Sequence, residues 1–467
     1  MAPTGTPFPK SLKWALGFYF LCFLGAYFIL QLKYRPAEVD DSWWLSFAYN
    51  FLHRHITYDV ISGATVPWNG ITHFGKTYAF LIGTILDFFG WTKTHAYDLS
   101  LCFVLGGFTA WYFILRRLQY SRELCATFCV AGLLLDPFFS AALSARTEAF
   151  VYLISSLALL LFVWDRYFES MVMAWISLET HPIGAVVFFL MAAVFWARQS
   201  RHIPPLPKFP RILTLSLGGF AVGALYYVVL YPANLSQLPS ILVQGNQMGD
   251  HSTQNFLFDY FFHSKYHRHF IEFVLFLVCA FEFFRKKIFK NDPLVLPLTV
   301  SLLLFTFIFR RPMYHYALYF YPAFLLMLAK VFEVRWSLTL LTLGLLGLLL
   351  PQYAFVYRLH RDYDFNKEVK NYQKLIPADS LPVLGGYNGW FAFPGRDFYF
   401  RKYYGDLQKL GLTRFYLIDE DGPGENNIPE ITDYLRSHFK PERIGDFYMG
   451  KWHFIITSEE SLSQQKS

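Results

Sequence analysis

Three carboxylates lie close together near the start of this 467-residue chain, at Glu38, Asp40 and Asp41. One aspartate could cap a helix, as is common, but capping leaves the other carboxylates unexplained. Carboxylates this close raise one another's pKa, which suits a general base or a cation site. Aromatic residues at helical spacing follow the pair: Trp43, Trp44, Phe47 and Phe51. Asp40 and Asp41 are therefore predicted to open an interfacial helix and to be a catalytic acidic pair.

Cations that could bind an anionic group occur in three other places. Lys76 lies in a loop too long for a plain connector, where it could meet a phosphate or simply snorkel. Arg146 precedes Glu148 at the start of an apolar helix, and the two could pair or belong to a site. Arg310 and Arg311 precede another apolar helix, and a phosphate suits two adjacent arginines. Polar neighbours complete the candidates: His73, His315 and Tyr316.

The elements that must position these residues are long apolar segments. The chain is 54% hydrophobic, 20% aromatic and 16% charged, with a net charge of +7, whereas an average soluble domain is about 25% charged. This composition excludes disorder, and no basic patch supports a nucleic-acid partner. Eleven segments are candidates for membrane-spanning helices: Ser11–Gln31, Ala96–Leu115, Leu124–Leu143, Ala149–Trp164, Met171–Thr180, Pro182–Trp196, Ile212–Tyr231, Phe270–Phe284, Pro293–Phe309, Tyr316–Ala329 and Trp336–Gln352.

Two short segments in this series meet at Thr180, His181 and Pro182. They are predicted either as two thin spans or as one broken helix, which a membrane tolerates only where protein or a cavity covers the freed backbone groups. His181 at this break is a further site candidate. The alternative is that its side chain only packs in the protein interior.

Lysine and arginine predict the orientation. With the N-terminus inside, sixteen of these residues fall in the inside segments and ten in the longer outside loops. The odd number of spans then places the C-terminus outside, on the side of the acidic pair and the candidate cations. Arg310 and Arg311 lie in a predicted outside loop and are therefore exceptions to the positive-inside rule. Such an exception indicates that the two arginines bind an anionic partner.

The composition changes after Gln352. Helical patterns at 366–375 and 430–438 alternate with β-like runs at 382–386, 396–400, 414–418 and 450–457, separated by turn signals. We expect residues 1–352 to form a transmembrane domain, with interfacial helices in its first outer loop, and residues 353–467 to form a small extracytoplasmic α/β domain. All five cysteines fall in the predicted spans, so no disulfide framework is visible outside.

Taken in order, these segments resemble the integral-membrane glycosyltransferases of the GT-C superfamily, which include protein O-mannosyltransferases and lipid A aminoarabinose transferases. Asp40-Asp41 occupies the place of the Asp-Glu or Asp-Asp pair that opens the first outer loop in those families. Three other segments resemble family motifs: 73–81, with a Gly-Lys core; 145–149, which contains Arg-Thr-Glu; and 311–322, which begins with Arg and ends with Pro. His181 lies where the families more often carry a cation.

The resemblance implies a chemistry and a set of partners. A polytopic enzyme of this kind moves a sugar, with inversion, from a polyprenyl-phosphate donor to a hydroxyl of a glycan, lipid or protein acceptor. Asp40 would be the general base and Asp41 the neighbour that orients it. The leaving phosphate would be met by cations: Arg310, Arg311, Lys76 and Arg146. No dedicated metal-ligand set is visible in the sequence, and a divalent ion on the carboxylates stays open.

Other classes of protein also stay open. A transporter or flippase of lipid-linked or anionic substrates would carry mid-membrane charges and paired inverted repeats, whereas the charges here lie near the predicted outer edge. A membrane-anchored scaffold would work through its outer domain, and a ligase would use a diphosphate donor. We expect a bacterial plasma membrane rather than an endoplasmic reticulum, although Asn234-Leu-Ser236 is a glycosylation sequon in an outer loop.

Overall fold

The computed structural model describes residues 10–33, 39–57, 60, 74–201, 208–231, 268–288, 292, 294–308, 318–319, 321–334, 362–400, 411–421 and 429–462. They belong to two compact units, of which the first comprises Met1–Tyr27, Ser100–Leu143 and Thr147–Ala354. The second comprises Phe28–Leu99, Ser144–Arg146 and Phe355–Ser467. The predicted boundary at Gln352 and the predicted span Trp336–Gln352 lie outside the described residues.

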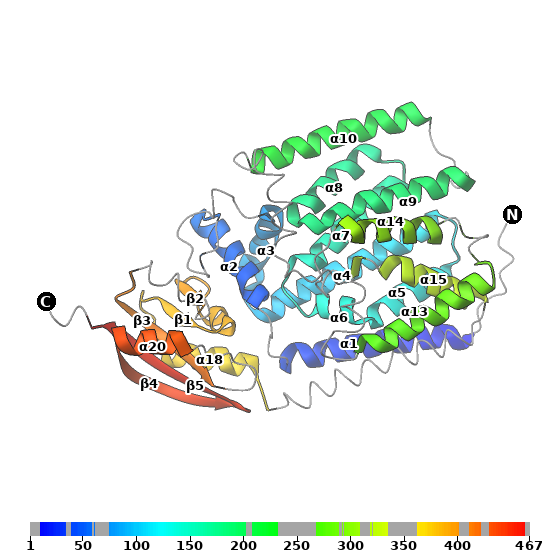
Figure 1. The fold of residues 1–467 in the computed structure, drawn as a ribbon. Coiled ribbons are helices and arrows are strands. Elements are labelled where there is room, and N and C mark those ends of the chain that lie inside the picture. Colours follow the sequence, from blue (N-terminus) through cyan, green and yellow to red (C-terminus); the bar gives the residue numbers. More distant parts are fainter. Residues whose placement is uncertain are drawn as a thin grey trace. The chain divides into compact units, whose positions relative to one another are not determined.

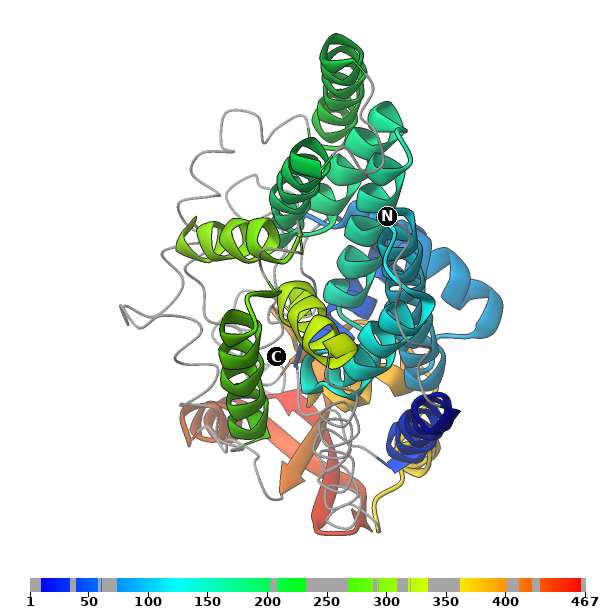
Figure 2. The ribbon, with the colours of Figure 1, turned by 90° about the vertical axis from the view of Figure 1, so that its right-hand side faces the viewer.

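Apolar helices build the first unit (Figures 1 and 2). Those that lie wholly or mainly in it are α1 (Lys10–Lys33), α4 (Lys93–Arg117), α5 (Arg122–Leu134), α6 (Asp136–Ala142), α7 (Thr147–Val163), α8 (Tyr167–Thr180), η2 (Pro182–Ala185), α9 (Val186–Arg201), α10 (Phe209–Leu230), α13 (Arg268–Arg285), α14 (Val295–Ile308) and α15 (Tyr321–Val334). Within the described residues, four helical segments are long and apolar enough to cross a membrane, or five if one bent pair counts as a span: Leu12–Gln31, Lys93–Arg117, Pro182–Gln199 and Phe209–Leu230.

The bent pair is the segment that the sequence predicts as one span, Leu124–Leu143. In the structure α5 and α6 meet at an angle of 69°, and Leu135 between them is extended. Pro137 explains the break, because proline cannot continue the hydrogen-bond ladder of α5 but fits the first turn of a new helix.

The second predicted break separates α8 from η2 and α9. His181 is extended, and Pro182 starts the 3-10 turn that leads into α9. Gly184 allows η2 to pack closely against α8, because a Cβ at this position would overlap the carbonyl of Ser177. Of the two segments, Pro182–Gln199 is the one that is long and apolar enough to span.

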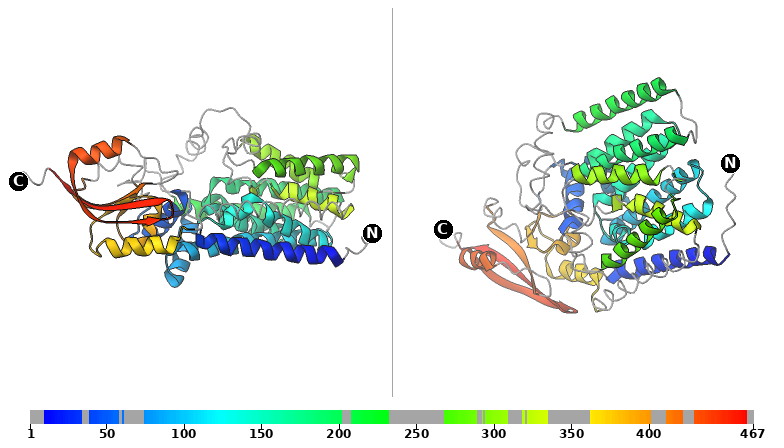
Figure 3. Two further views of the ribbon diagram at one scale, coloured as in Figure 1. Left: turned by 90° about the horizontal axis from the view of Figure 1, so that it is seen from below. Right: turned by 45° about the vertical axis from the view of Figure 1, so that its right-hand side comes forward.

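The second unit combines helices with a mixed sheet (Figure 3). Its helices are α2 (Val39–Arg54), α3 (Lys76–Phe89), α18 (Phe365–Leu375), η7 (Tyr387–Ala392) and α20 (Pro429–His438), and its strands are β1 (Val383–Gly385), β2 (Phe398–Phe400), β3 (Arg414–Asp421), β4 (Phe439–Met449) and β5 (Trp452–Ser461). The strand order is β2-β1-β3-β5-β4, parallel from β2 to β3 and antiparallel from β3 to β4. Its buried cluster contains Leu384, Tyr399, Phe415, Leu417, Leu435 and Phe439.

Four of these strands and both long C-terminal helices follow the sequence prediction, whereas β4 was missed. This strand pairs with β5 along its length and forms one edge of the sheet. Most of its residues are exposed or half-buried and it contains Pro441. An exposed edge strand lacks the alternating apolar pattern that identifies buried strands, and its proline and charges are features of edges.

Candidate active site

The acidic pair lies in the first turn of α2, as the sequence predicts. The Asp41 side chain is 3% exposed. Its Oδ1 accepts a hydrogen bond from the backbone N–H of Ala145 at 2.6 Å, and its Oδ2 accepts one from the Tyr97 hydroxyl at 2.7 Å. Hydrogen bonds to an ionised carboxylate are about twice as strong as neutral ones. Two separate segments of the second unit therefore hold this carboxylate in place.

Both oxygens of Asp41 are already hydrogen-bonded, which makes it better suited to fix α2 than to accept a proton. The Asp40 side chain lies outside the described residues, and its assignment as the base stays a prediction.

The Ala145 peptide is held from both sides. Its N–H donates to Asp41, and its carbonyl accepts a hydrogen bond from the Tyr78 hydroxyl at 2.9 Å. Tyr78 lies two residues after Lys76, and Arg146 follows Ala145 directly. The side chains of Lys76 and Arg146 are both buried. Hydrogen bonds through the Ala145 peptide thus connect Asp41 to the two segments that carry Lys76 and Arg146. Both residues are among the predicted phosphate-binding cations.

The position of Lys76 depends on the turn before it. Gly75 has φ 85°, in the left-handed region that glycine adopts most easily, and it precedes the first residue of α3. Trp44 of α2 then packs edge-on against Tyr78 of α3, with ring centroids 5.8 Å apart. Trp44, one of the aromatic residues at helical spacing in α2, therefore packs this helix against the one that carries Lys76.

Lys93 is a buried cation that sequence reasoning did not select. In the sequence it is one of the ten lysines and arginines of the predicted outside loops. Its side chain is 2% exposed, and its Nζ lies 4.2 Å from the ring centroid of Phe365 and 5.5 Å from that of Tyr97. Asp41 and Glu368 are among the anions that act electrostatically on it. The sequence offers one signal only, the i, i+4 spacing of Lys93 and Tyr97 on a helix.

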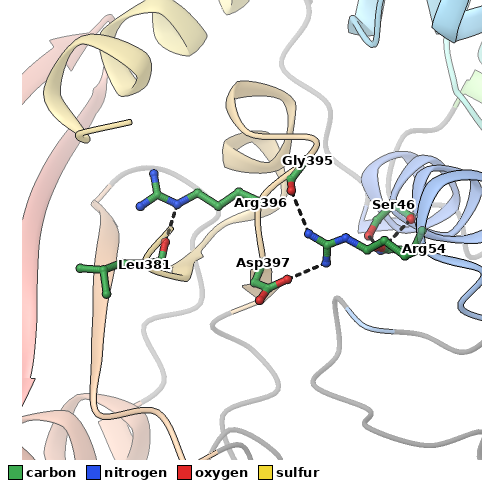
Figure 4. A network of polar contacts seen from close by, with 7 residues as sticks. Ser46, Arg54, Leu381, Gly395, Arg396 and Asp397 are labelled. Atoms are coloured by element: carbon green, nitrogen blue, oxygen red, sulfur yellow. Dashed lines mark hydrogen bonds and ion pairs between the residues drawn. The ribbon is translucent and has the colours of Figure 1, made fainter. Parts of the chain in front are cut away.

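The far end of α2 is also fixed (Figure 4). Arg54 donates to Asp397 Oδ1 at 2.6 Å and to the carbonyl of Gly395 at 2.8 Å. Next to these residues, Arg396 pairs with Asp379. Burial raises the pKa of Asp379, but the hydrogen bond from Tyr416 and the charge of Arg396 outweigh this effect and lower the pKa.

Two other candidates lie in the first unit. Glu148 is buried at the start of α7, and its backbone carbonyl accepts a hydrogen bond from Tyr319 at 3.0 Å. His181 Nδ1 accepts a hydrogen bond from the N–H of Ile183 at 3.1 Å, so this side chain caps η2. Among the described residues, no group of three His, Cys, Asp or Glu side chains is placed to hold a metal ion.

The remaining candidates lie outside the described residues: His73, Arg310, Arg311, His315 and Tyr316. The two adjacent arginines therefore stay a prediction of the sequence.

The described part of the chain is mostly helical, with several apolar helices and a small mixed sheet near the C-terminus. The structure is similar to the crystal structure of ArnT from Cupriavidus metallidurans in the apo state, with a TM-score of 0.62 and 10% sequence identity. The match covers 96% of this chain and 98% of ArnT. The sequence itself matches no protein-family model and no curated protein.

Proposed function

We propose that this protein is an inverting glycosyltransferase that moves a sugar from a polyprenyl-phosphate donor to a hydroxyl of a glycan, lipid or protein acceptor. The single observation that carries the proposal is the held carboxylate of Asp41, beside Asp40, at the start of α2 in a GT-C-like fold. ArnT, a GT-C aminoarabinose transferase, has the same fold. We place the reaction on the extracytoplasmic side of a bacterial plasma membrane.

The proposed step needs one base and several cations. Asp40 takes the proton of the acceptor hydroxyl, whose oxygen forms a bond to the anomeric carbon while the bond from that carbon to the phosphate oxygen breaks. A placed carboxylate base contributes about 10²–10⁴-fold to such a step. The polyprenyl phosphate leaves as an anion, and fixed cations stabilise its charge in a site shielded from water. Candidates for this task are Lys76, Arg146, Arg310 and Arg311, with His315 and Tyr316 beside the arginines.

Substitution of the acidic pair tests the proposal. Purified protein is incubated with a panel of polyprenyl-phosphate sugars and acceptors, and released polyprenyl phosphate is measured by mass spectrometry. Asp40→Asn should abolish release, and Asp41→Asn should reduce it about 10–100-fold because the base is no longer held in place. Glu169→Gln, which changes a half-exposed carboxylate on α8 that pairs with Arg166 just before that helix, is the matched control and should retain activity.

The same assay separates the enzyme from a transporter or flippase. A flippase moves the lipid-linked sugar without breaking its phosphate bond, so wild-type protein would release no polyprenyl phosphate. Full activity in both Asp40→Asn and Asp41→Asn would sink the assignment of the acidic pair even if the wild type is a transferase.

A further inference from the structure

The helix α2 is held near both ends by other parts of the second unit. Near its N-terminus, Asp41 accepts hydrogen bonds from Tyr97 and Ala145. At its C-terminus, Arg54 binds Asp397 in the C-terminal part of the chain. The helix that carries the acidic pair is therefore positioned by contacts from distant sequence, and its placement depends on more than its own packing.

Lys93 connects the contacts of Asp41 near the N-terminus of α2 with the C-terminal part of the chain. It begins α4 one turn before Tyr97, the residue that donates to Asp41. Its ammonium group lies 4.2 Å from the ring centroid of Phe365, the first residue of α18. Cations at this distance from an aromatic face are attracted to it, more so when they are shielded from water. Lys93 thus contacts the first turn of α18 directly.

Glu368 is the anion on the α18 side. Its side chain is fully buried, and its two oxygens accept hydrogen bonds from Tyr363 at 2.5 Å and from Tyr372 at 2.9 Å. Lys93 interacts electrostatically with Glu368 as well as with Asp41. A buried carboxylate is costly unless it is paired and hydrogen-bonded. Lys93 therefore lies within electrostatic reach of two buried carboxylates on different elements, α2 and α18.

This arrangement couples α18 to α2 through charge. Removal of the cation would leave Asp41 and Glu368 buried without their shared counter-charge, which strongly favours rearrangement over keeping both in place. The groups that would move are the start of α18 and the first turn of α2, which bears the acidic pair.

We propose that Lys93 is a positioning residue of the active site, which holds the first turn of α2 in register with α18 and so makes the C-terminal domain part of the catalytic apparatus. The proposal rests on the proposed function, because it assigns the acidic pair as the group being positioned. It gives the C-terminal residues a purpose other than that of a separate binding module.

Hydrogen–deuterium exchange on the full-length protein in detergent tests the positioning without any substrate. Lys93→Met should increase exchange in peptides that cover 39–54 and 365–375, and Glu368→Gln should increase it in the same two places. Lys93→Arg, which keeps the cation, should restore protection. If the Met variant does not fold, Glu368→Gln and the Arg variant decide the question.

A matched control is available in the first unit. Lys330 also lies over an aromatic ring, that of Tyr120 at 4.8 Å, and pairs with a buried carboxylate, Asp292, at 3.7 Å. Lys330→Met removes the same kind of contact far from α2 in sequence. It should leave exchange in 39–54 unchanged, which separates a specific effect from general loss of a buried ion pair.

Release of polyprenyl phosphate provides the second readout. Lys93→Met should lower kcat by about 10–100-fold, while the Kd for polyprenyl phosphate changes less than about threefold, because positioning acts on the step and not on donor binding. Losses in Lys93→Met and Glu368→Gln should not add in the double variant, since both break one coupling. A weakened Kd with unchanged kcat would overturn the proposal, as would additive losses.

The two proposals fail in different ways. If exchange in 39–54 is unchanged in both Lys93→Met and Glu368→Gln, Lys93 is not a positioning residue, whatever the enzyme does. If wild-type protein releases no polyprenyl phosphate but the exchange pattern appears as expected, the proposed function is wrong and the coupling of α2 to α18 stands.

Discussion

The hydrogen bond from Tyr97 to Asp41 can be removed by one substitution, which tests how much this contact contributes to holding the carboxylate. Tyr97→Phe deletes one hydroxyl from a buried site and leaves the carboxylate one donor short. Hydrogen bonds to charged groups contribute about 1.5–3 kcal/mol, and a buried acceptor without its donor carries the desolvation cost as well. We expect a lower melting temperature and a several-fold loss of transfer activity, with the donor Kd unchanged.

Tyr112→Phe on the same helix is the control for Tyr97→Phe. Its ring packs edge-on against Phe113, with centroids 5.6 Å apart, and the substitution keeps that packing. Equal effects of the two substitutions on melting and activity would show that the Tyr97 hydroxyl does not matter for Asp41.

Features that depend on residues close together in the sequence were predictable, whereas contacts between residues far apart in the sequence were not. The acidic pair and the helix it opens follow from local spacing, and both are present in α2. Tyr97 lies 56 residues and Ala145 lies 104 residues from Asp41. No local pattern encodes such separations, and a lysine such as Lys93 at the end of a span has the same signature whether it snorkels or is buried.

Close packing of α8 against α10 depends on small residues in α10. A Cβ at Gly219 would overlap the carbonyl oxygen of Phe168, and a Cβ at Gly223 would overlap Trp175. Small residues at i and i+4 allow helix backbones to approach in membranes, where van der Waals packing drives association. Gly219→Ala should separate the two helices and lower the melting temperature in detergent, with an overpacking cost of about 1–3 kcal/mol.

The adjacent glycine is the natural control for that substitution. A Cβ at Gly218 would lie 3.6 Å from Phe168 Cδ2, an ordinary van der Waals contact. Alanine is also the better helix former by about 1 kcal/mol, so Gly218→Ala should leave the melting temperature unchanged or raise it. Equal destabilisation by both substitutions would contradict close packing at Gly219.

At the level of elements, hydropathy predicted where apolar helices lie but not how they bend. A window of apolar residues across 124–143 gives the same average whether the backbone turns by 69° or runs straight. Pro137 was the available signal for the turn. The strand β4 shows the opposite case, because an exposed edge carries no apolar alternation to detect.

In the first unit, several cations that the sequence predicts on the inside form ion pairs with aspartates between the helices. Asp165, between α7 and α8, pairs with Arg198 of α9 at 3.0 Å and with Arg117 of α4 at 3.7 Å. Asp292, before α14, likewise pairs with Lys330 of α15. These ion pairs gather helix ends that the positive-inside rule assigns to one face of the membrane.

The positive-inside rule predicts the topology of the whole chain. Arg166, in the turn before α8, is exposed, and Lys451 is exposed in the turn between β4 and β5. With a membrane-impermeant maleimide, Lys451→Cys should be labelled when the extracytoplasmic face is accessible, and Arg166→Cys only after the membrane is permeabilised. The unsubstituted protein, with its five native cysteines, sets the background. Labelling of Arg166→Cys from the outside would invert the topology and place the acidic pair on the cytoplasmic face, where the proposed extracytoplasmic transfer cannot occur.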